Sequence, residues 1–145
     1  MLVSHVLKEK GDSVVTVRDS APLMAVVLAM TERRIGALVV TDDRGAITGV
    51  VSEREVVMSL ARHQAGALRC RVRDIAIKAV TVAAGDPVRL AMAAMTEHRA
   101  RHLLVLEDGG VVGLLSVGDV IKSRLSEKEV ENQVLQDLAR MTRAA

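Results

Sequence analysis

Residues 113–121 read GLLSVGDVI, and residues 49–57 read GVVSEREVV. Outward from this pair, three further stretches recur in the same order along the chain. These stretches are 14–17 with 79–82, 25–32 with 90–97, and 37–40 with 102–105. The second unit is one residue shorter, and the loss falls in a turn, where residues 41–46 shorten to 106–110. Two units that agree in content and order indicate an internal duplication.

Each unit reads as a strand, a helix, two strands joined by a turn, and a second helix. Asp19 or Ser20 is predicted to cap the first helix, with Pro22 in its first turn and its end near Arg34. The strands are predicted at 14–17, 38–41 and 47–51 in the first unit, and at 79–82, 103–106 and 111–115 in the second. The second helix of each unit is predicted at 53–63 and at 117 to about 125.

A small sheet with two helices cannot bury its apolar face alone, whereas two such units facing each other can. The sequence therefore predicts an α+β (α/β) fold of two β-α-β-β-α repeats packed as one pseudo-two-fold pair. The predicted layout is an N-terminal segment 1–13, repeats 14–63 and 79–125 around a linker 64–78, and a C-terminal helix 126–145. One face of that last helix is apolar, through Val130, Val134, Leu138 and Met141.

Composition narrows the class of protein. The chain has 145 residues, of which 50% are hydrophobic and 26% charged, as in a globular domain. A formal charge of only +2 and a complete lack of aromatic residues argue against nucleic-acid binding, which uses basic and stacking surfaces. No apolar run is long enough for a membrane span, and the first residues do not read as a signal peptide. We expect a cytoplasmic protein that binds neither nucleic acid nor membrane, and in which Cys70 forms no disulfide within the chain.

The repeated Ser-x-x-Asp/Glu pattern stands where the third strand of each unit meets its last helix. Locally, Ser52 with Glu55 and Ser116 with Asp119 are capping boxes, and a purely structural role is the simplest interpretation. The same place also suits a ligand, because a helix N-terminus attracts phosphate and a carboxylate one turn further on can accept hydrogen bonds from ribose hydroxyls. The occurrence of this pattern at equivalent places in both units favours a binding role.

The doubled unit that ends in Gly, two apolar residues and Ser-x-x-Asp resembles the CBS domain, named from cystathionine β-synthase. The resemblance covers Val14 to about Leu125 and is greatest to small free-standing CBS pairs. It implies a regulatory module that binds an adenine nucleotide (AMP, ADP, ATP) or NAD between its repeats. In such a site Asp119 would hold the ribose, Ser116 would contact phosphate, and Arg101 and His102 would face the phosphates. The walls around the adenine would come from Leu114, Val14, Val15 and Thr16.

The resemblance also implies a second, equivalent site in the first unit. There Ser52 keeps its role, but Glu55 replaces the aspartate and carries its carboxylate one methylene further out. Arg54 would supply positive charge, and Val50, Val80 and Thr81 are the remaining candidates. We expect the Asp119 site to be the principal one.

Other functions are less well supported by the sequence. His5, His63, His98, His102 and Cys70 show no metal-ligand spacing, and no nucleophile-and-base arrangement is visible, so we predict neither a metal site nor an enzyme. Two alternatives to a nucleotide sensor remain open. One is an interaction module with degenerate pockets, and the other is a sensor of S-adenosylmethionine. In each case the expected partners are a second copy of the chain and an unidentified regulated protein.

Overall fold

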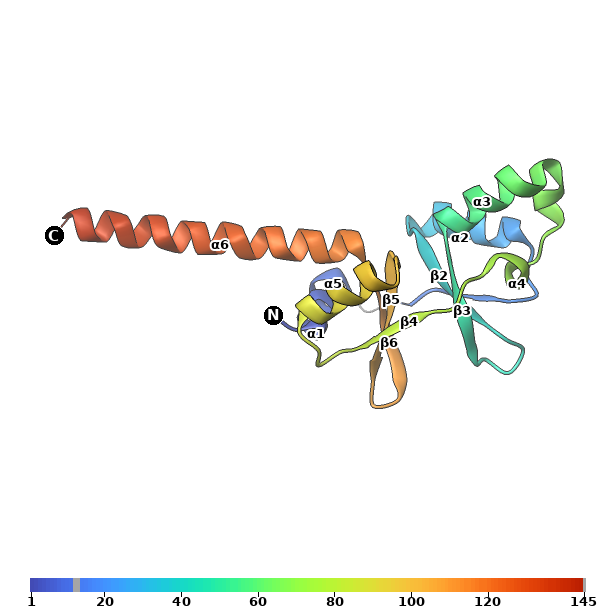
Figure 1. Cartoon of the computed structure of the whole chain (residues 1–145), viewed down its shortest axis with the longest axis horizontal. Helices are drawn as coiled ribbons and strands as arrows, with labels where there is room; N and C mark the ends of the chain where they lie inside the picture. Colours follow the sequence, from blue (N-terminus) through green and yellow to red (C-terminus); the bar gives the residue numbers. More distant parts are fainter. Residues whose placement is uncertain (12–13, 145) are drawn as a thin grey trace.

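The computed structural model describes residues 1–11 and 14–144 and shows two like units beside each other (Figure 1). The first unit comprises β1 (Thr16–Arg18), α2 (Leu23–Arg33), β2 (Ala37–Thr41), β3 (Ile47–Ser52) and α3 (Glu53–His63). The second comprises β4 (Val80–Ala83), α5 (Val88–Glu97), β5 (His102–Glu107), β6 (Gly110–Ser116) and α6 (Val117–Ala144). Each unit has a three-stranded sheet whose first two strands are parallel and whose last two are antiparallel. The predicted α+β duplication is confirmed.

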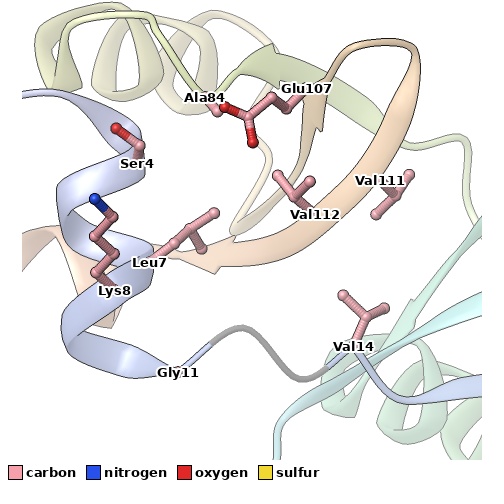
Figure 2. A pocket seen from close by; sticks show the side chains of 9 residues that line it. All are labelled: Ser4, Leu7, Lys8, Gly11, Val14, Ala84, Glu107, Val111 and Val112. Atoms are coloured by element: carbon pink, nitrogen blue, oxygen red, sulfur yellow. The ribbon is translucent and has the colours of Figure 1, made fainter.

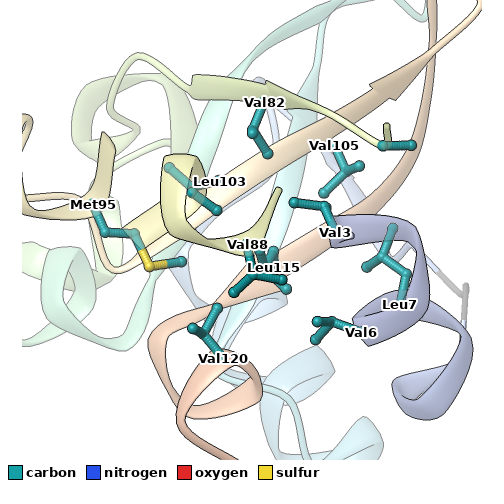
Figure 3. Packing of buried hydrophobic residues seen from close by; sticks show 12 residues of the cluster. Val3, Val6, Leu7, Val82, Val88, Met95, Leu103, Val105, Leu115 and Val120 are labelled. Carbon is teal, nitrogen blue, oxygen red and sulfur yellow. The ribbon is translucent and has the colours of Figure 1, made fainter. Parts of the chain in front are cut away.

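The segment before the first repeat belongs structurally to the second unit. It forms a helix, α1 (Val3–Lys10), in which Leu7 points toward Val112 on β6 (Figure 2). Val3, Val6 and Leu7 are buried in the same cluster as core residues of β4, α5, β5, β6 and α6 (Figure 3). These partners include Val82, Val88, Met95, Leu103, Val105, Leu115 and Val120. Burial of three apolar side chains therefore fixes α1 on the second unit.

The linker makes the reciprocal contact with the first unit. It contains a 3-10 helix, η1 (Gln64–Arg69), and a short helix, α4 (Val72–Ile75). Val72 is fully buried in the core of the first unit, and its N–H donates to the carbonyl of Ala21 at 2.9 Å. Each unit is thus completed by a helix that precedes the other unit in sequence. The predicted ranges 14–63 and 79–125 leave these two helices out.

This exchange also explains how the first helix of each unit begins. Asp19 and Ser20 are not its cap, because the capping position is Pro22 and no side chain caps the helix. The N–H of Leu23 instead donates to the carbonyl of Cys70 at 3.1 Å, and that of Val88 donates to the carbonyl of Met1 at 3.0 Å. In each unit, a carbonyl from the segment that precedes the other unit (Met1 before α1, Cys70 before α4) therefore accepts from a backbone N–H in the first turn of the helix, which a capping side chain would otherwise do.

The two units meet through their sheets. Val39, Val50 and Leu104 are buried in one cluster that joins the units. Beside it, Val50 exchanges two backbone hydrogen bonds of 2.9 Å with Ile77, which leads into β4. Gly49 permits this approach, since a Cβ at that position would lie 2.4 Å from the carbonyl oxygen of Ile77. The predicted pairing of the repeats therefore rests on both apolar packing and backbone hydrogen bonds.

The last helix does not break where the predicted repeat ends. Helix α6 runs for 28 residues, with Val120 and Ser123 buried, and then extends away from both units (Figure 1). Its distal part exposes Val130, Val134, Leu135, Leu138 and Met141. Residues 12–13 of the predicted N-terminal segment and residue 145 of the predicted C-terminal helix lie outside the described residues. In the part of the chain that the structure describes, no helix is both long and apolar enough to cross a membrane.

Candidate functional site

The repeated motif forms a capping box in both units. In the second unit the N–H of Ser116 donates to Asp119 Oδ2 at 2.8 Å, and the N–H of Asp119 donates to Ser116 Oγ at 3.1 Å. In the first unit the N–H of Ser52 donates to Glu55 Oε2 at 2.7 Å, and the Ser52 hydroxyl donates to the same oxygen. The structural interpretation of the motif is therefore correct for both copies, and a binding role has to rest on what surrounds each cap.

Asp119 has a partner that the sequence did not suggest. Lys10, the last residue of α1, donates from Nζ to Asp119 Oδ2 at 2.8 Å and to the carbonyl of Leu114 at 2.6 Å. Burial raises the pKa of the Asp119 carboxyl, but hydrogen bonds from Lys10 and Ser116 and the charge of Lys10 outweigh it and lower the pKa. Asp119 is therefore ionised at neutral pH and held in one orientation.

A cavity of about 360 Å³ opens beside this carboxylate and is walled by both units. Its volume lies in the range of small-molecule sites. The polar and charged lining residues are Lys10, Arg34, His102, Ser116 and Asp119. The remaining lining residues are mostly apolar: Gly11, Val14, Val15, Ile35, Gly36, Ala37 and Leu114. An apolar chamber with a fixed carboxylate at the start of a helix and cations beside it suits a ligand with an apolar ring, hydroxyls and an anionic group.

The equivalent place in the first unit is nearly closed. The hollow beside Ser52 and Glu55 measures about 40 Å³, and only 8% of Glu55 is exposed. Its other lining residues include Val50, Arg54, Lys78, Val80, Arg99, Arg101 and His102. A hollow of this size does not admit a nucleotide. The longer glutamate side chain turns back onto Ser52 and fills the space next to its own cap.

Because the two units pack about a pseudo-two-fold axis, some residues that were predicted to line one space line the other. The start of the second strand in each unit pairs with the cap of its own unit and also lines the space beside the other cap. Arg101 lines the hollow beside Ser52 and Glu55 and is not among the lining residues of the Asp119 cavity. Arg34, which ends α2 in a left-handed conformation with φ 52°, lines that cavity instead. His102 lines both spaces. The structure thus brings together Asp119, Ser116, His102, Leu114, Val14 and Val15 as predicted, but not Thr16 or Arg101.

In the first-unit set, the structure gathers Ser52, Glu55, Val50, Arg54 and Val80 around the small hollow. Thr81 lies elsewhere, in an open hollow that includes the turn residues Gly45 and Gly109. Sequence reasoning missed Lys10 and Arg34 in the Asp119 cavity. Arg34 occupies the position in the first unit that Arg99 occupies in the second, and both are left-handed non-glycine residues at φ 52° and 50°. Such a conformation costs free energy and often marks functional positions.

His102 lies between the two caps. Burial and the charge of Lys10 lower the pKa of His102 below that of a free imidazole. The carboxylates of Glu55, Asp119 and Glu53 oppose this shift without reversing it. His102 is therefore neutral at pH 7 and gains a proton more readily when another negative charge approaches.

A family model described as "CBS domain" matches residues 4–62 and 72–126. The chain belongs to the CBS-domain family. Both matched ranges begin within an exchanged helix, 4–62 in α1 and 72–126 in α4, so the family's unit includes the helices that the sequence analysis left outside the repeats.

Several CBS-domain proteins are similar to most of the chain. The mitochondrial CBS domain-containing protein CBSX3 of Arabidopsis thaliana is 32% identical over 92% of this chain and 69% of its own length. The CBS-domain containing protein ATU1752 of Agrobacterium tumefaciens is 34% identical, with a TM-score of 0.80 over 85% of this chain and 92% of that chain. The CBS domain protein PAE2072 of Pyrobaculum aerophilum, solved in complex with AMP, is 29% identical, with a TM-score of 0.73 over 82% and 89%.

The CBS pair has a further groove of about 710 Å³ beside α1, lined by Ser4, Leu7, Lys8, Glu107, Val111 and Val112 among others (Figure 2). It contains no capped carboxylate at a helix start, so the Asp119 cavity remains the better site. Among the described residues, no three His, Cys, Asp or Glu side chains gather as a metal site.

Proposed function

We propose that this CBS pair is a regulatory module that binds one adenine nucleotide per chain in the Asp119 cavity. The observation that carries the proposal is the combination, in one cavity between the two repeats, of an ionised carboxylate at the start of α6 with cations and apolar walls. A ribose hydroxyl is a suitable donor to Asp119, and phosphate is a suitable ligand for Arg34 and the helix N-terminus. The AMP bound to the similar protein PAE2072 supports the same ligand class.

The proposed ligands are AMP, ADP, ATP or NAD, all of which combine adenine, ribose and phosphate. We propose Arg34 as the phosphate contact in place of Arg101, because Arg34 lines the cavity and Arg101 lines the small hollow. A single nucleotide per chain is proposed because the hollow beside Glu55 offers about 40 Å³. A catalytic role is not proposed, since the one carboxylate that lines the cavity has a lowered pKa and is already bound by Lys10 and the N–H of Ser116.

We further propose that the protein acts in the cytoplasm as a homodimer and controls a partner protein. The support for association is apolar surface on several helices, including Leu28 on α2, Val57 on α3, Ile121 on α6 and the apolar face of the distal part of α6. A single cysteine agrees with a reducing compartment. Light scattering that finds a monomer at micromolar concentration, with and without nucleotide, would exclude the dimer.

The absence of aromatic residues makes the ligand test direct. With no Trp, Tyr or Phe, the polypeptide has almost no absorption where adenine absorbs strongly. We expect an adenine band that co-elutes with purified protein, or that appears after incubation with AMP, ATP or NAD and desalting, with one equivalent bound by calorimetry. If neither measurement detects binding of an adenine nucleotide at millimolar concentration, the sensor function is wrong and the chain is an interaction module.

A further inference from the structure

The contact between Lys10 and Asp119 joins residues that are 109 positions apart in sequence. Lys10 is held in place by α1, whose buried residues Val3, Val6 and Leu7 anchor the helix on the second unit. Gly113 on β6 assists, because a Cβ there would lie 2.8 Å from Leu7. Helix α1 therefore places Lys10 in the wall of the cavity.

The two oxygens of Asp119 have different surroundings. Oδ2 accepts hydrogen bonds from both Lys10 and the N–H of Ser116. Within residues 1–11 and 14–144, Oδ1 accepts no hydrogen bond. A ribose hydroxyl can therefore donate to Oδ1 while Lys10 remains on Oδ2, so the ion pair does not block the site.

The charge of the cavity depends on Lys10. Lys10 and Arg34 are its cationic lining residues, Asp119 is its carboxylate, and Glu53 lies near its edge beside Gly36. An unneutralised Asp119 would repel the phosphate that is attached to the same ribose it binds, and would attract a cationic group at that position. Lys10 removes this repulsion while leaving the carboxylate able to accept hydrogen bonds.

We propose that Lys10 is the specificity-determining residue of the Asp119 site, which it makes selective for adenosyl ligands that carry phosphate over those that are neutral or carry a sulfonium. The inference rests on the proposed nucleotide-binding function and deepens it. It assigns S-adenosylmethionine, whose sulfonium is positive next to the ribose, to the disfavoured class.

The test compares three ligands on Lys10→Met by calorimetry: AMP, adenosine and S-adenosylmethionine. We expect the Kd for AMP to rise at least about fivefold, because a unit charge about 4 Å from a phosphate changes affinity by about that factor even at the dielectric constant of water, and by more near a protein surface. The Kd for adenosine should change less than about threefold, and S-adenosylmethionine should bind about as tightly as before or more tightly. The matched control is Lys8→Met in the same helix, which makes no ion pair among the described residues and should leave all three affinities unchanged.

Two results would overturn the assignment. An equal loss of affinity for all three ligands would mean that Lys10 only stabilises the position of α1. An equal gain of affinity would mean that Lys10 occupies the site and competes with every ligand. Far-UV circular dichroism of Lys10→Met checks that the fold is intact. Failure of the wild-type protein to bind any adenosine ligand would instead refute the proposed function itself, so the two failures are distinguishable.

Discussion

Replacement of Asp119 by alanine, compared with Glu55→Ala, tests whether the two caps differ in function. In the proposed complex, Asp119 accepts at least one charge-assisted hydrogen bond from ribose through Oδ1. Loss of such bonds costs about 2–3 kcal/mol, which corresponds to an increase in Kd of about 30- to 150-fold. Glu55 lies beside a hollow of about 40 Å³, so its loss should change the Kd less than about threefold.

The order of the two variants should reverse for the free energy of unfolding, with Glu55→Ala losing more stability than Asp119→Ala. Asp119→Ala removes a partly exposed ion pair with Lys10 and one bond of the capping box, a loss of about 1 kcal/mol in the free energy of unfolding. Glu55→Ala removes a buried carboxylate and leaves the N–H and hydroxyl of Ser52 without their acceptor, which costs about 1–3 kcal/mol. A loss of 1 kcal/mol lowers the Tm of a chain of this size by about 3–5 °C.

The assay combines calorimetry with AMP and thermal unfolding followed by far-UV circular dichroism. The expected pattern is a large affinity loss with a small Tm shift for Asp119→Ala, and the reverse for Glu55→Ala. Equal affinity losses in two variants of equal stability would refute the assignment of Asp119 as the ribose ligand. A Tm of Glu55→Ala equal to that of wild type would refute the structural role of Glu55.

Three further predictions concern other parts of the molecule. The pKa of His102 is lowered in the free protein, and an anionic ligand would raise it, so binding takes up a proton. The affinity for NAD should therefore rise as pH falls from about 8 to 6. Calorimetric titrations of His102→Gln should show no such rise. Gly49→Ala would force a Cβ against the carbonyl of Ile77 and should destabilise the protein by about 2 kcal/mol or more in urea unfolding, whereas Gly113→Ala meets only a leucine side chain that can move and should cost less. Deletion of residues 127–144 should leave the Tm within about 3 °C, because the deleted side chains lie outside the core, but should weaken self-association measured by light scattering.

The pH dependence of the free energy of unfolding follows from the lowered pKa values of Asp119 and His102. Asp119 has a pKa below its unfolded value, so its contribution is present above the unfolded pKa and is lost as pH falls through the folded one. His102 also has a lowered pKa, and as a base it takes up more protons in the unfolded chain. Its contribution is therefore complete above the unfolded pKa of about 6.5 and declines as pH falls below it.

The fold was predictable because its signal is internal to the sequence. Repetition of the strands and of the Ser-x-x-Asp/Glu cap gave the architecture without any knowledge of tertiary contacts. The exchanged helices were missed because they are short and their similarity is slight. Only Val3 with Val72 and Val6 with Ile75 match at equivalent spacing in α1 and α4, and only their burial in the opposite units reveals their role.

The site was predicted in part, for a related reason. Ser116, Asp119 and Leu114 are neighbours in sequence, so a local motif identifies them together. Lys10 and Arg34 reach the cavity from other elements, and which cap each strand faces depends on the pseudo-two-fold packing. A local pattern cannot report that packing. Arg101 was predicted beside Asp119 because each unit was treated as self-contained, whereas in the structure it is among the residues that line the hollow beside Ser52 and Glu55.

The difference between the two caps arises from the residues that the opposite unit presents to them. Gly36 and Ala37 of the first unit correspond to Arg101 and His102 of the second. Each pair lines the space beside the other unit's cap, so the small pair leaves room beside Asp119 and the large pair helps to fill the space beside Glu55, although His102 also lines the Asp119 cavity. The lack of an Arg-His pair in the first unit therefore does not weaken a site of its own. It leaves room for the cavity in the second, and divergence at these two positions, together with the replacement of aspartate by Glu55, separates one candidate binding site from one nearly closed hollow.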